Sequence, residues 1–489
     1  MEGNPSSAFI FDRIGMSELH SPASSPSTEI PSASDIEASG LHRAVTLWQA
    51  TSINMIEMIG IGPFIVIPLI MQQLGSGWFL IPWLAGALIS ALDGLIWSEL
   101  GAAFPLAGGS YQFLKAAYGS YSWGRLMPFL FVWQTMVQAP LVAASASIGF
   151  SQYACYLLPL GYWGQKILSG SIIICITLLL YRRIETIGRI SIWLWIGVML
   201  TMLWIIVGGV WGVHVHHQVR GFHFRADFWE AGIMAILGHA TVQAMYAYLG
   251  YYNVCHLGAE IKNPARNIPR SIQLSIAGVA LLYLLMNLSL AQGINPAAQH
   301  NGLAVSLFIE QQFGPSWARV ATLLILWIAF SSLFSLMLGY SRVPYAAALD
   351  GYFFPVFART HPSKHFPHIS LLTLGALAFL FSLLFRIEQV ISAILAMRIL
   401  VQFIGQAIGL ALLHRRLDRS RFPFRMMGYP IPLVLSVLAW LMIFISTGWK
   451  FVISGLIMIG AGAGVFYLIK PWREKWQQHE SKGDKPLDT

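Results

Sequence analysis

The stretch EMIGIGPF, Glu57 to Phe64, interrupts an apolar segment, residues 46–74, that is long enough to cross a membrane. Gly60, Gly62 and Pro63 disfavour a helix here, because a Gly costs about 1 kcal/mol and a Pro about 3 kcal/mol in a helix interior. A break in hydrocarbon leaves backbone N–H and C=O groups unpaired, and is tolerated only where protein or a water-filled cavity satisfies them. The stretch is therefore a candidate binding site, or else a proline kink packed closely on a neighbouring helix.

The composition predicts a polytopic membrane protein. Of 489 residues, 56% are hydrophobic and only 10% are charged, and the mean hydropathy is +0.63, which is too apolar for a soluble chain of this length. The sequence pI of about 9.5 does not indicate a nucleic-acid partner, since the basic residues are spread between apolar segments. Cys155, Cys175 and Cys255 lack metal-ligand spacing and are predicted to be buried, unpaired thiols.

The two ends of the chain are polar. Residues 1–40 hold ten Ser, four Pro, six acidic residues and one basic residue, Arg13, and they lack the basic and apolar parts of a signal peptide. They are predicted to form a disordered cytoplasmic tail, and residues 471–489 a second cytoplasmic tail. The membrane domain is then residues 41–470.

Apolar runs of about 20 residues predict twelve membrane-spanning helices. They lie near residues 46–74 (broken), 78–103, 124–153, 164–181, 187–212, 231–258 (broken), 270–293, 316–346, 369–386, 388–413, 428–446 and 450–470. With the N-terminus inside, 23 of the 30 Lys and Arg residues fall in cytoplasmic segments, six fall outside, and Arg398 lies within span ten. This asymmetry predicts a cell-membrane protein with both termini in the cytoplasm.

Three segments between the spans have their own expectations. Residues 104–114 are too rich in turn formers to span, and are predicted to form a cytoplasmic loop that runs into an interfacial helix. Residues 301–313 are predicted to form a short external amphipathic segment. His214, Val215 and His216 alternate in the pattern of an extended loop, with His217 and His223 close behind, and no Cys or nearby carboxylate completes a metal site.

A second break lies in span six, where Tyr246 to Asn253 reads YAYLGYYN. Its glycine, Gly250, follows Gly60 of the first break by 190 residues. Interrupted helices at corresponding places in two halves are typical of inverted-repeat transporters, whose substrate binds at the midplane between the repeats. The repeats are then about 41–212 and 228–414, and the helices at about 428–470 are additions.

Four motifs make the similarity to a known family specific. They are Gly60–Phe64; Ser98–Leu100 with Phe104-Pro105 and Ala107–Tyr111; Tyr248–Gly250 leading to Gly258–Pro264 and Ile268–Arg270; and Ser341-Arg342 to Asp350-Gly351, Pro355 and His361-Pro362. With these, the chain resembles an amino acid permease of the amino acid–polyamine–organocation superfamily. The resemblance implies an all-α fold of the LeuT-like five-plus-five kind, with helices 1 and 6 broken and helices 11 and 12 added.

The function implied by this resemblance is secondary active transport of an amino acid by alternating access, by a monomer or homodimer. The Gly-Pro-Phe form of the first break and Asp93 are also similar to plant-type polyamine uptake permeases, so a polyamine or cationic amino acid carrier or exchanger is the alternative. A non-transporting nutrient sensor on the same fold is the alternative from another class. An enzyme is not expected, since no nucleophile with a base, phosphate loop or metal set is present, and no cofactor is implied.

The predicted substrate site follows from the chemistry of broken helices. Exposed N–H groups suit a carboxylate and exposed carbonyls suit an ammonium group. By the resemblance, the amides of Ile61 and Gly62 hold the substrate carboxylate, carbonyls near Tyr248 and Gly250 take the amino group, and Tyr248 is an aromatic gate. The predicted substrate-binding residues are Gly60, Ile61, Gly62, Tyr248, Gly250 and Asn253.

Three ionisable residues lie inside apolar spans, Glu57, Asp93 and Arg398, and intramembrane charges are costly and usually functional. Asp93 could carry a coupling proton, since burial favours the neutral acid, or it could receive a cationic substrate. Arg398 could accept a substrate carboxylate, and an internal pair of Arg398 with an acid that fixes two helices is the structural alternative. Glu99, at the end of span two, is predicted to pair with a loop arginine.

The coupling ion is predicted from two sets of residues. Ser331 and Ser332 lie on the turn of span eight that supplies hydroxyls to Na⁺ in sodium-coupled members of this fold, although serines also simply pack helices. Many sodium-independent members carry a lysine in span five, and this chain has no lysine between Arg189 and Lys262. Proton coupling through Asp93 is favoured over Na⁺ at Ser331 and Ser332, because an acid inside a span is costly and usually functional, whereas serines commonly pack helices.

Overall fold

The computed structural model of the chain describes residues 41–119, 121, 124–216, 232–291, 304–384 and 390–468. The predicted tails, 1–40 and 471–489, and the histidines His217 and His223 lie outside the described residues. Within those ranges the protein is helical and contains no β-strand.

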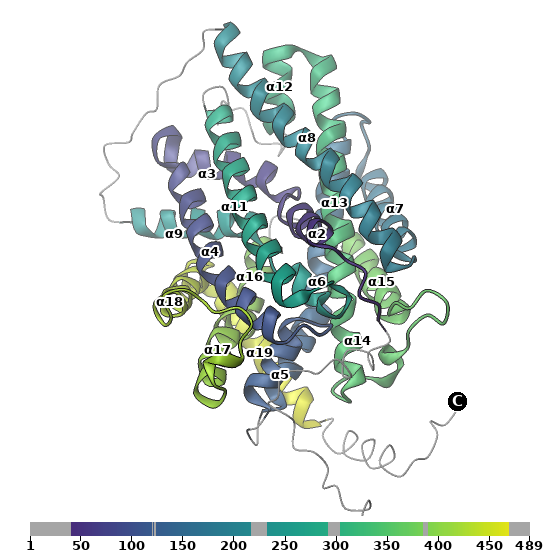
Figure 1. Cartoon of the computed structure of the whole chain (residues 1–489). Helices are drawn as coiled ribbons and strands as arrows, with labels where there is room; N and C mark the ends of the chain where they lie inside the picture. The colour runs from purple at the N-terminus through teal and green to yellow at the C-terminus, as the bar shows by residue number, and fades with distance from the viewer. Residues whose placement is uncertain are drawn as a thin grey trace, which may run out of the picture.

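The helices follow one another along the chain and pack into a bundle (Figure 1). The α-helices are α2 (Leu47–Met58), α3 (Gly62–Trp78), α4 (Leu80–Ala103), α5 (Ser110–Tyr118), α6 (Leu126–Ala154), α7 (Tyr162–Leu180), α8 (Ile184–His216), α9 (Ile233–Tyr248), α10 (Asn253–His256), α11 (Pro264–Ala291), α12 (Ala304–Phe313), α13 (Pro315–Tyr340), α14 (Arg342–Leu349), α15 (His368–Leu384), α16 (Val390–Arg398), α17 (Gln406–Arg416), α18 (Ile431–Ser446) and α19 (Trp449–Leu468). Short 3₁₀ turns lie at η2 (Gly258–Glu260), η4 (Pro355–Ala358) and η7 (Arg419–Arg421), and η6 (Ile399–Gly405) is a π-helix.

Each predicted span contains helical residues that the structure describes, and span ten contains α16, η6 and α17. In the described part of the chain, eight helices are long and apolar enough to cross a membrane, and the bent pair α2–α3 makes a ninth. The apolar helices α15 and α18 are shorter. The protein is therefore a multi-pass membrane protein. One expectation was wrong: residues 214 and 216, predicted in an extended loop, are the last turn of α8.

The first break lies where the glycines and the proline predict it. Helix α2 ends at Met58, α3 begins at Gly62, and the two are bent by 44°. Pro63 stands in the first turn of α3, where its missing N–H has no partner to lose and its fixed φ suits the helix. Pro63 therefore favours the start of α3 after the break that follows Met58.

The second break depends on one glycine. Helix α9 ends at Tyr248, and Gly250 follows with φ = +120°, a backbone conformation that L side chains rarely adopt. A Cβ at Gly250 would also lie 2.8 Å from Cγ of Glu57 in the first break. The two breaks are therefore in contact, and Gly250 is needed both for its φ and for that approach.

Packing brings the two broken helices to the centre of the bundle (Figure 1). Helix α3 packs on α9, and α10 packs on α2. Around them, α4 packs along α11 and α6 along α13. The late helices α18 and α19 lie outside this group, α18 against α4 and α9, and α19 against α16 and α6.

The segment after α4 forms a loop and then a helix, as predicted, and it closes one end of the bundle. Gly108 and Gly109 turn the loop with positive φ, and the Gly108 N–H donates to the carbonyl of His256 at the end of α10 (3.0 Å). Helix α5 follows, and its Tyr111 donates to Asp350 (2.9 Å). Burial and the neighbouring Asp350 carboxylate raise the pKa of the Tyr111 phenol, so it remains a neutral donor.

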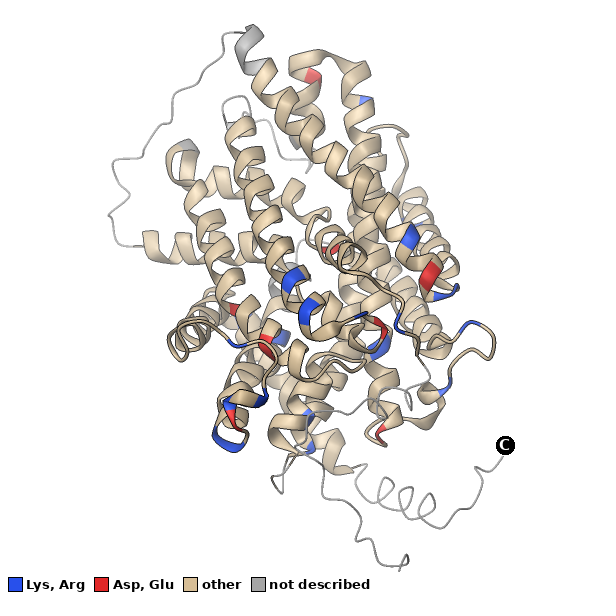
Figure 2. Cartoon of the chain, in the orientation of Figure 1, with Lys and Arg blue, Asp and Glu red and all other residues tan. Residues whose placement is uncertain are grey.

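Charged residues are distributed unevenly along the bundle. Figure 2 shows that the described Lys and Arg residues gather at the end that carries α5, α14 and α17, while the end near α12 is almost free of them. This is the one-sided pattern expected of a membrane protein whose basic loops share a side.

The described cysteines are free, as predicted, but they are not all buried. Cys255 is buried, Cys155 is partly exposed and Cys175 is exposed. The burial prediction was wrong for Cys175 because its face of α7 points away from the bundle, where lipid rather than protein would cover it.

Candidate functional site

A cavity of about 50 Å³ lies where the two broken helices meet. Its volume is on the order of a few water molecules, taking about 10–15 Å³ for each in this measure. Its lining consists of Glu57, Met58, Gly60, Ile61, Gly62 and Pro63 of the first break; Tyr246, Ala247, Leu249 and Tyr252 of the second; Ser332, Leu336 and Tyr340 of α13; Ile394 and Arg398 of α16; and Val142 and Ala146 of α6. Five elements far apart in the sequence therefore build one small chamber.

Glu57 is the acid of this cavity. It stands at the end of α2, one residue before the helix stops. Its Oε2 atom is buried and has no hydrogen-bond partner among the described residues, and no ion pair there involves Glu57. A carboxylate oxygen left in this condition is costly, because burial removes water without supplying a donor.

Arg398 is the positively charged residue of the cavity lining, and it is only 3% exposed. Its Nε donates to Gln402 (2.8 Å), and its Nη2 donates to the hydroxyls of Tyr252 and Tyr340. The guanidinium carbon also lies 5.2 Å from the ring centre of Tyr252 and 5.7 Å from that of Tyr340. Arg398 is the last residue of α16, immediately before the π-helix η6, and π-helical turns are frequent at functional sites.

Three of the six predicted substrate residues line the cavity: Gly60, Ile61 and Gly62. A Cβ on Gly60 would lie 2.6 Å from Oγ of Ser332, and one on Gly62 would lie 3.1 Å from Cε1 of Tyr246. Both glycines are thus needed for close packing at the wall. Because Gly60 and Gly62 line the cavity without side chains, the backbone of the first break borders the chamber and also packs closely on its neighbours.

The other three predicted residues lie outside the lining. Tyr248 is fully buried against α4, where a Cβ on Gly86 would meet its ring at 2.7 Å, and it contacts Trp83 and Tyr283. Gly250 faces Glu57 from behind the wall.

Asn253 is also outside the lining. It donates to the carbonyl (2.8 Å) and hydroxyl (2.9 Å) of Ser335, and so ties α10 to α13.

The aromatic residues that do line the cavity are Tyr246, Tyr252 and Tyr340. Tyr246 and Tyr248 are two residues apart in α9, and two residues turn a helix by about 200°, so only one of them can face the chamber. Helical periodicity in the sequence is enough to show that Tyr246 and Tyr248 lie on different faces of α9. Which face meets the cavity depends on Gly86 of α4, which is not visible in the local sequence.

Asp93 lies away from the cavity, in a closed set of neutral donors. Its carboxylate accepts from Tyr251 (2.5 Å), Trp440 (3.1 Å) and Ser436 (3.3 Å). No ion pair within the described part of the chain involves it. Asp93 therefore joins α4 to the second break and to α18.

The two serines of α13 differ in their contacts. Ser332 lines the cavity and donates to the carbonyl of Glu57 (3.3 Å), whereas Ser331 donates to the carbonyl of Trp327 in its own helix (2.7 Å). Only Ser332 is thus directed at the first break.

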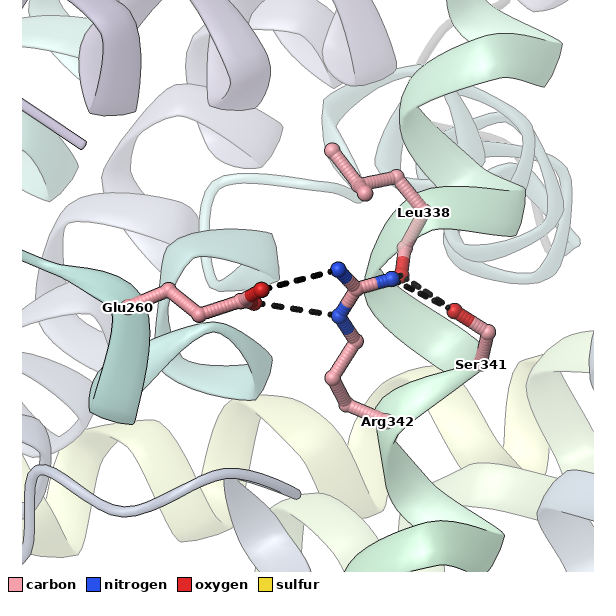
Figure 3. A network of polar contacts seen from close by, with 4 residues as sticks. All are labelled: Glu260, Leu338, Ser341 and Arg342. Atoms are coloured by element: carbon pink, nitrogen blue, oxygen red, sulfur yellow. Dashed lines mark hydrogen bonds and ion pairs between the residues drawn. The ribbon is translucent and has the colours of Figure 1, made fainter. Parts of the chain in front are cut away.

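Buried ion pairs lie near the basic end. Glu260 and Arg342, 0% and 1% exposed, form a two-pronged pair at 2.9 and 3.0 Å, and Arg342 also donates to the Leu338 carbonyl and the Ser341 hydroxyl (Figure 3). The Glu260 carbonyl accepts from the backbone of Val45, just before α2 (2.9 Å). This network, the Glu260–Arg342 pair, joins both broken helices to α13.

Glu99 has a different partner from the one predicted. It accepts from Nε2 of His414 (2.9 Å) and from the backbone N–H of Met426 (3.0 Å), so the expected loop arginine was wrong. His414 is reached only through the tertiary packing of α17 beside α4.

The chain is similar in sequence to known proteins over most of its length. The family model described as amino acid permease matches residues 45–469. The chain is 23% identical to the branched-chain amino acid permease BcaP of Bacillus subtilis (strain 168) over 460 residues, covering 90% of this chain and 95% of that protein. It is 26% identical to the human cystine/glutamate transporter, covering 89% and 87%. It is also 26% identical to the mouse cationic amino acid transporter 4, covering 72% and 56%.

Proposed function

The chain belongs to the amino acid permease family, and from that premise we propose that it is a secondary active transporter which moves an amino acid across the membrane by alternating access. The observation that carries this proposal is the cavity at the junction of the two breaks. Irregular backbone of the two breaks lines a chamber there, and the same lining contains the acidic residue Glu57 and the basic residue Arg398.

A twelve-span arrangement with two five-helix repeats is part of the proposal. Contacts between helices support it, because pairs that pack together within or between the repeats still pack together when spans one to five are exchanged for spans six to ten in order. The pair α2 and α11 (spans one and seven) corresponds to α9 and α4 (six and two), and the pair α6 and α15 (three and nine) to α13 and α7 (eight and four). The pairs α4–α11 and α6–α13 correspond to themselves.

We place the basic end of the bundle in the cytoplasm, following the positive-inside rule. The Glu260–Arg342 pair then closes the cytoplasmic side below the cavity, and substrate release requires it to part. Cysteines introduced near positions 416 and 473 should be labelled only from the cytoplasmic side, and one near position 220 only from outside. Labelling of 220 and 416 from the same face would contradict the twelve-span count.

Proton coupling through Asp93 is the proposed source of energy. Tyr251, which donates to Asp93, is next to Tyr252, which lines the cavity and holds Arg398. Protonation of Asp93 would remove its charge and turn one of its two oxygens into a hydroxyl, which would weaken the bonds from its three donors and so free the second break to move relative to α4 and α18. The alternative is Na⁺, with Ser332 and the Glu57 carbonyl among its oxygen ligands.

A carrier of cationic amino acids or polyamines is the second candidate. Glu57 favours it, because an unpaired acid in the chamber attracts a cation. The similarity to cationic amino acid transporter 4 points in the same direction.

The function is tested by a thermal-shift screen of the purified protein against amino acids and polyamines, followed by uptake of any binder into proteoliposomes. We expect an amino acid to raise the melting temperature and to be taken up with single-site saturation. Binding without uptake would indicate a nutrient sensor, and uptake that never saturates would indicate a channel.

A further inference from the structure

We infer that the cavity selects ligands that carry both a free ammonium group and a free carboxylate, with Glu57 binding the first and Arg398 the second. This inference rests on the proposed function and deepens it. It assigns to two side chains a recognition task that the broken backbone alone is expected to perform, and it decides between amino acids and polyamines.

The carboxylate of Glu57 is ready for a cationic partner. Its Oε2 has no hydrogen-bond donor in suitable geometry among the described residues, although Arg398 lines the same cavity. An ammonium group that entered the chamber would supply N–H donors and a balancing charge at once.

The guanidinium of Arg398 is oriented by hydrogen bonds that engage only some of its N–H groups. A guanidinium group has five N–H bonds in a planar fork. Its Nε and Nη2 donate to Gln402, Tyr252 and Tyr340, while Nη1 has no hydrogen-bond partner in the part of the chain that the structure describes. Partners on three elements therefore fix the orientation of the group and leave one nitrogen free for a ligand anion.

Pro63 lowers the number of backbone donors at the start of α3, and Arg398 can supply a donor in their place. The first N–H groups of α3 are free to bind an anion, but Pro63, in the first turn, contributes none. The helix terminus thus has one donor fewer than an ordinary one for a ligand carboxylate. A guanidinium in the same chamber compensates with a charge-assisted donor, which is stronger than the neutral amide that is missing.

The same geometry excludes polyamines. A diamine could satisfy Glu57, but its second charge would share a chamber of about 50 Å³ with the buried guanidinium, with no carboxylate to balance the two cations. A lone carboxylic acid meets the mirror-image problem at Glu57. Only a ligand with both groups leaves neither protein charge unpaired.

The test compares ligands that differ by one charged group. The probes are L-alanine and L-leucine, their decarboxylated counterparts ethylamine and isopentylamine, and their deaminated counterparts propionate and 4-methylpentanoate. L-lysine is compared with its decarboxylated counterpart cadaverine alone. Binding to the full-length protein in detergent is measured by ligand-induced thermal stabilisation and by competition, for wild type, Arg398→Gln and Glu57→Gln.

We expect at least one amino acid to bind wild type about 100-fold more tightly than either of its counterparts, as the loss of one charge-assisted contact implies. In Arg398→Gln the amino acid should bind at least tenfold more weakly, while its amine should bind no more weakly than to wild type. In Glu57→Gln the amino acid should bind more weakly, while its deaminated acid should bind no more weakly than to wild type.

Three results would overturn the inference while leaving amino acid transport standing. These are equal weakening of amino acid and amine in Arg398→Gln, as a merely structural arginine predicts; an unchanged preference in both variants; and cadaverine binding as tightly as lysine. Absence of binding by every amino acid in wild type would instead overturn the proposed function. If Arg398→Gln does not fold, Arg398→Lys keeps the charge without the fork. It should retain the preference for amino acid over amine but at reduced strength, and a complete loss or no change contradicts the inference.

Discussion

Two acids and two arginines buried in this bundle are arranged in opposite ways. Glu260 and Arg342 lie together, with two hydrogen bonds between them and further acceptors for the guanidinium. Glu57 and Arg398 share a cavity without pairing, and each retains an atom with no partner among the described residues. The first couple is complete within the protein, whereas the second is completed only by a ligand.

This difference shows how the same residue types serve structure at one place and binding at another. A buried pair contributes little net stability, but removal of one partner is strongly destabilising because the other charge is left alone. Buried groups that lack hydrogen-bond partners carry a cost in the resting protein, and a ligand that supplies those partners recovers it. The comparison can be tested by removing partners from each couple in turn.

The largest effect is expected from Arg342→Met. Glu260 would be left buried and unpaired, which costs about 3–5 kcal/mol. The variant should lose most of its thermal stability, measured as the melting temperature of the purified protein. The double variant Glu260→Met/Arg342→Met should recover most of that loss. Glu57→Gln is the matched control from the open couple, and a loss there as large as in Arg342→Met would remove the distinction between the two couples.

Binding should be abolished by Gly62→Leu. The new side chain would begin 3.1 Å from Cε1 of Tyr246 and fill the wall of a chamber of only about 50 Å³. The measurement is ligand-induced thermal stabilisation, which should vanish although the protein remains inserted. Gly460→Leu is the control, because a Cβ there meets nothing within 4 Å. Unchanged affinity in Gly62→Leu would remove the first break from the site.

Asp93→Asn should separate exchange from accumulation. The amide keeps the size of the carboxyl group but cannot bind and release a proton, so the variant should exchange substrate while its accumulation ratio falls to about one. The measurement is uptake into sodium-free proteoliposomes under an inward proton gradient. Concentrative uptake that needs sodium and survives in Asp93→Asn would show that the coupling ion is not the proton.

The smallest effect is expected from Ser332→Ala. It removes one long hydrogen bond to the Glu57 carbonyl, worth about 0.5–1.5 kcal/mol, so substrate affinity should change by less than about tenfold. The informative measurement is the sodium dependence of uptake. A large rise in the sodium concentration required would indicate a Na⁺ site at Ser332 and would weaken the case for Asp93.

The sequence predicted those features that local chemistry controls. Gly60, Gly62 and Pro63 break the first span by their own backbone preferences, and Gly250 does so in the sixth. The choice of Tyr248 as a cavity residue depended on a face that Gly86 of another helix determines.

Partners chosen by tertiary contact were likewise beyond the sequence. Glu99 was expected to meet a loop arginine, but the fold brings His414 of α17 to it. The tyrosines that hold Arg398 come from the second break and from the end of α13, at separations of 146 and 58 residues. No local pattern links such positions, so the role of Arg398 could be proposed from the sequence but its orientation could not.

The most direct test of this account is a cryo-EM structure of the protein with the tightest-binding amino acid of the screen. We predict ligand density in the cavity between the two breaks, with the ammonium group within hydrogen-bond distance of Glu57 and the carboxylate within hydrogen-bond distance of Arg398. Density for the ligand elsewhere, or a direct ion pair between Glu57 and Arg398 in the occupied protein, would contradict it.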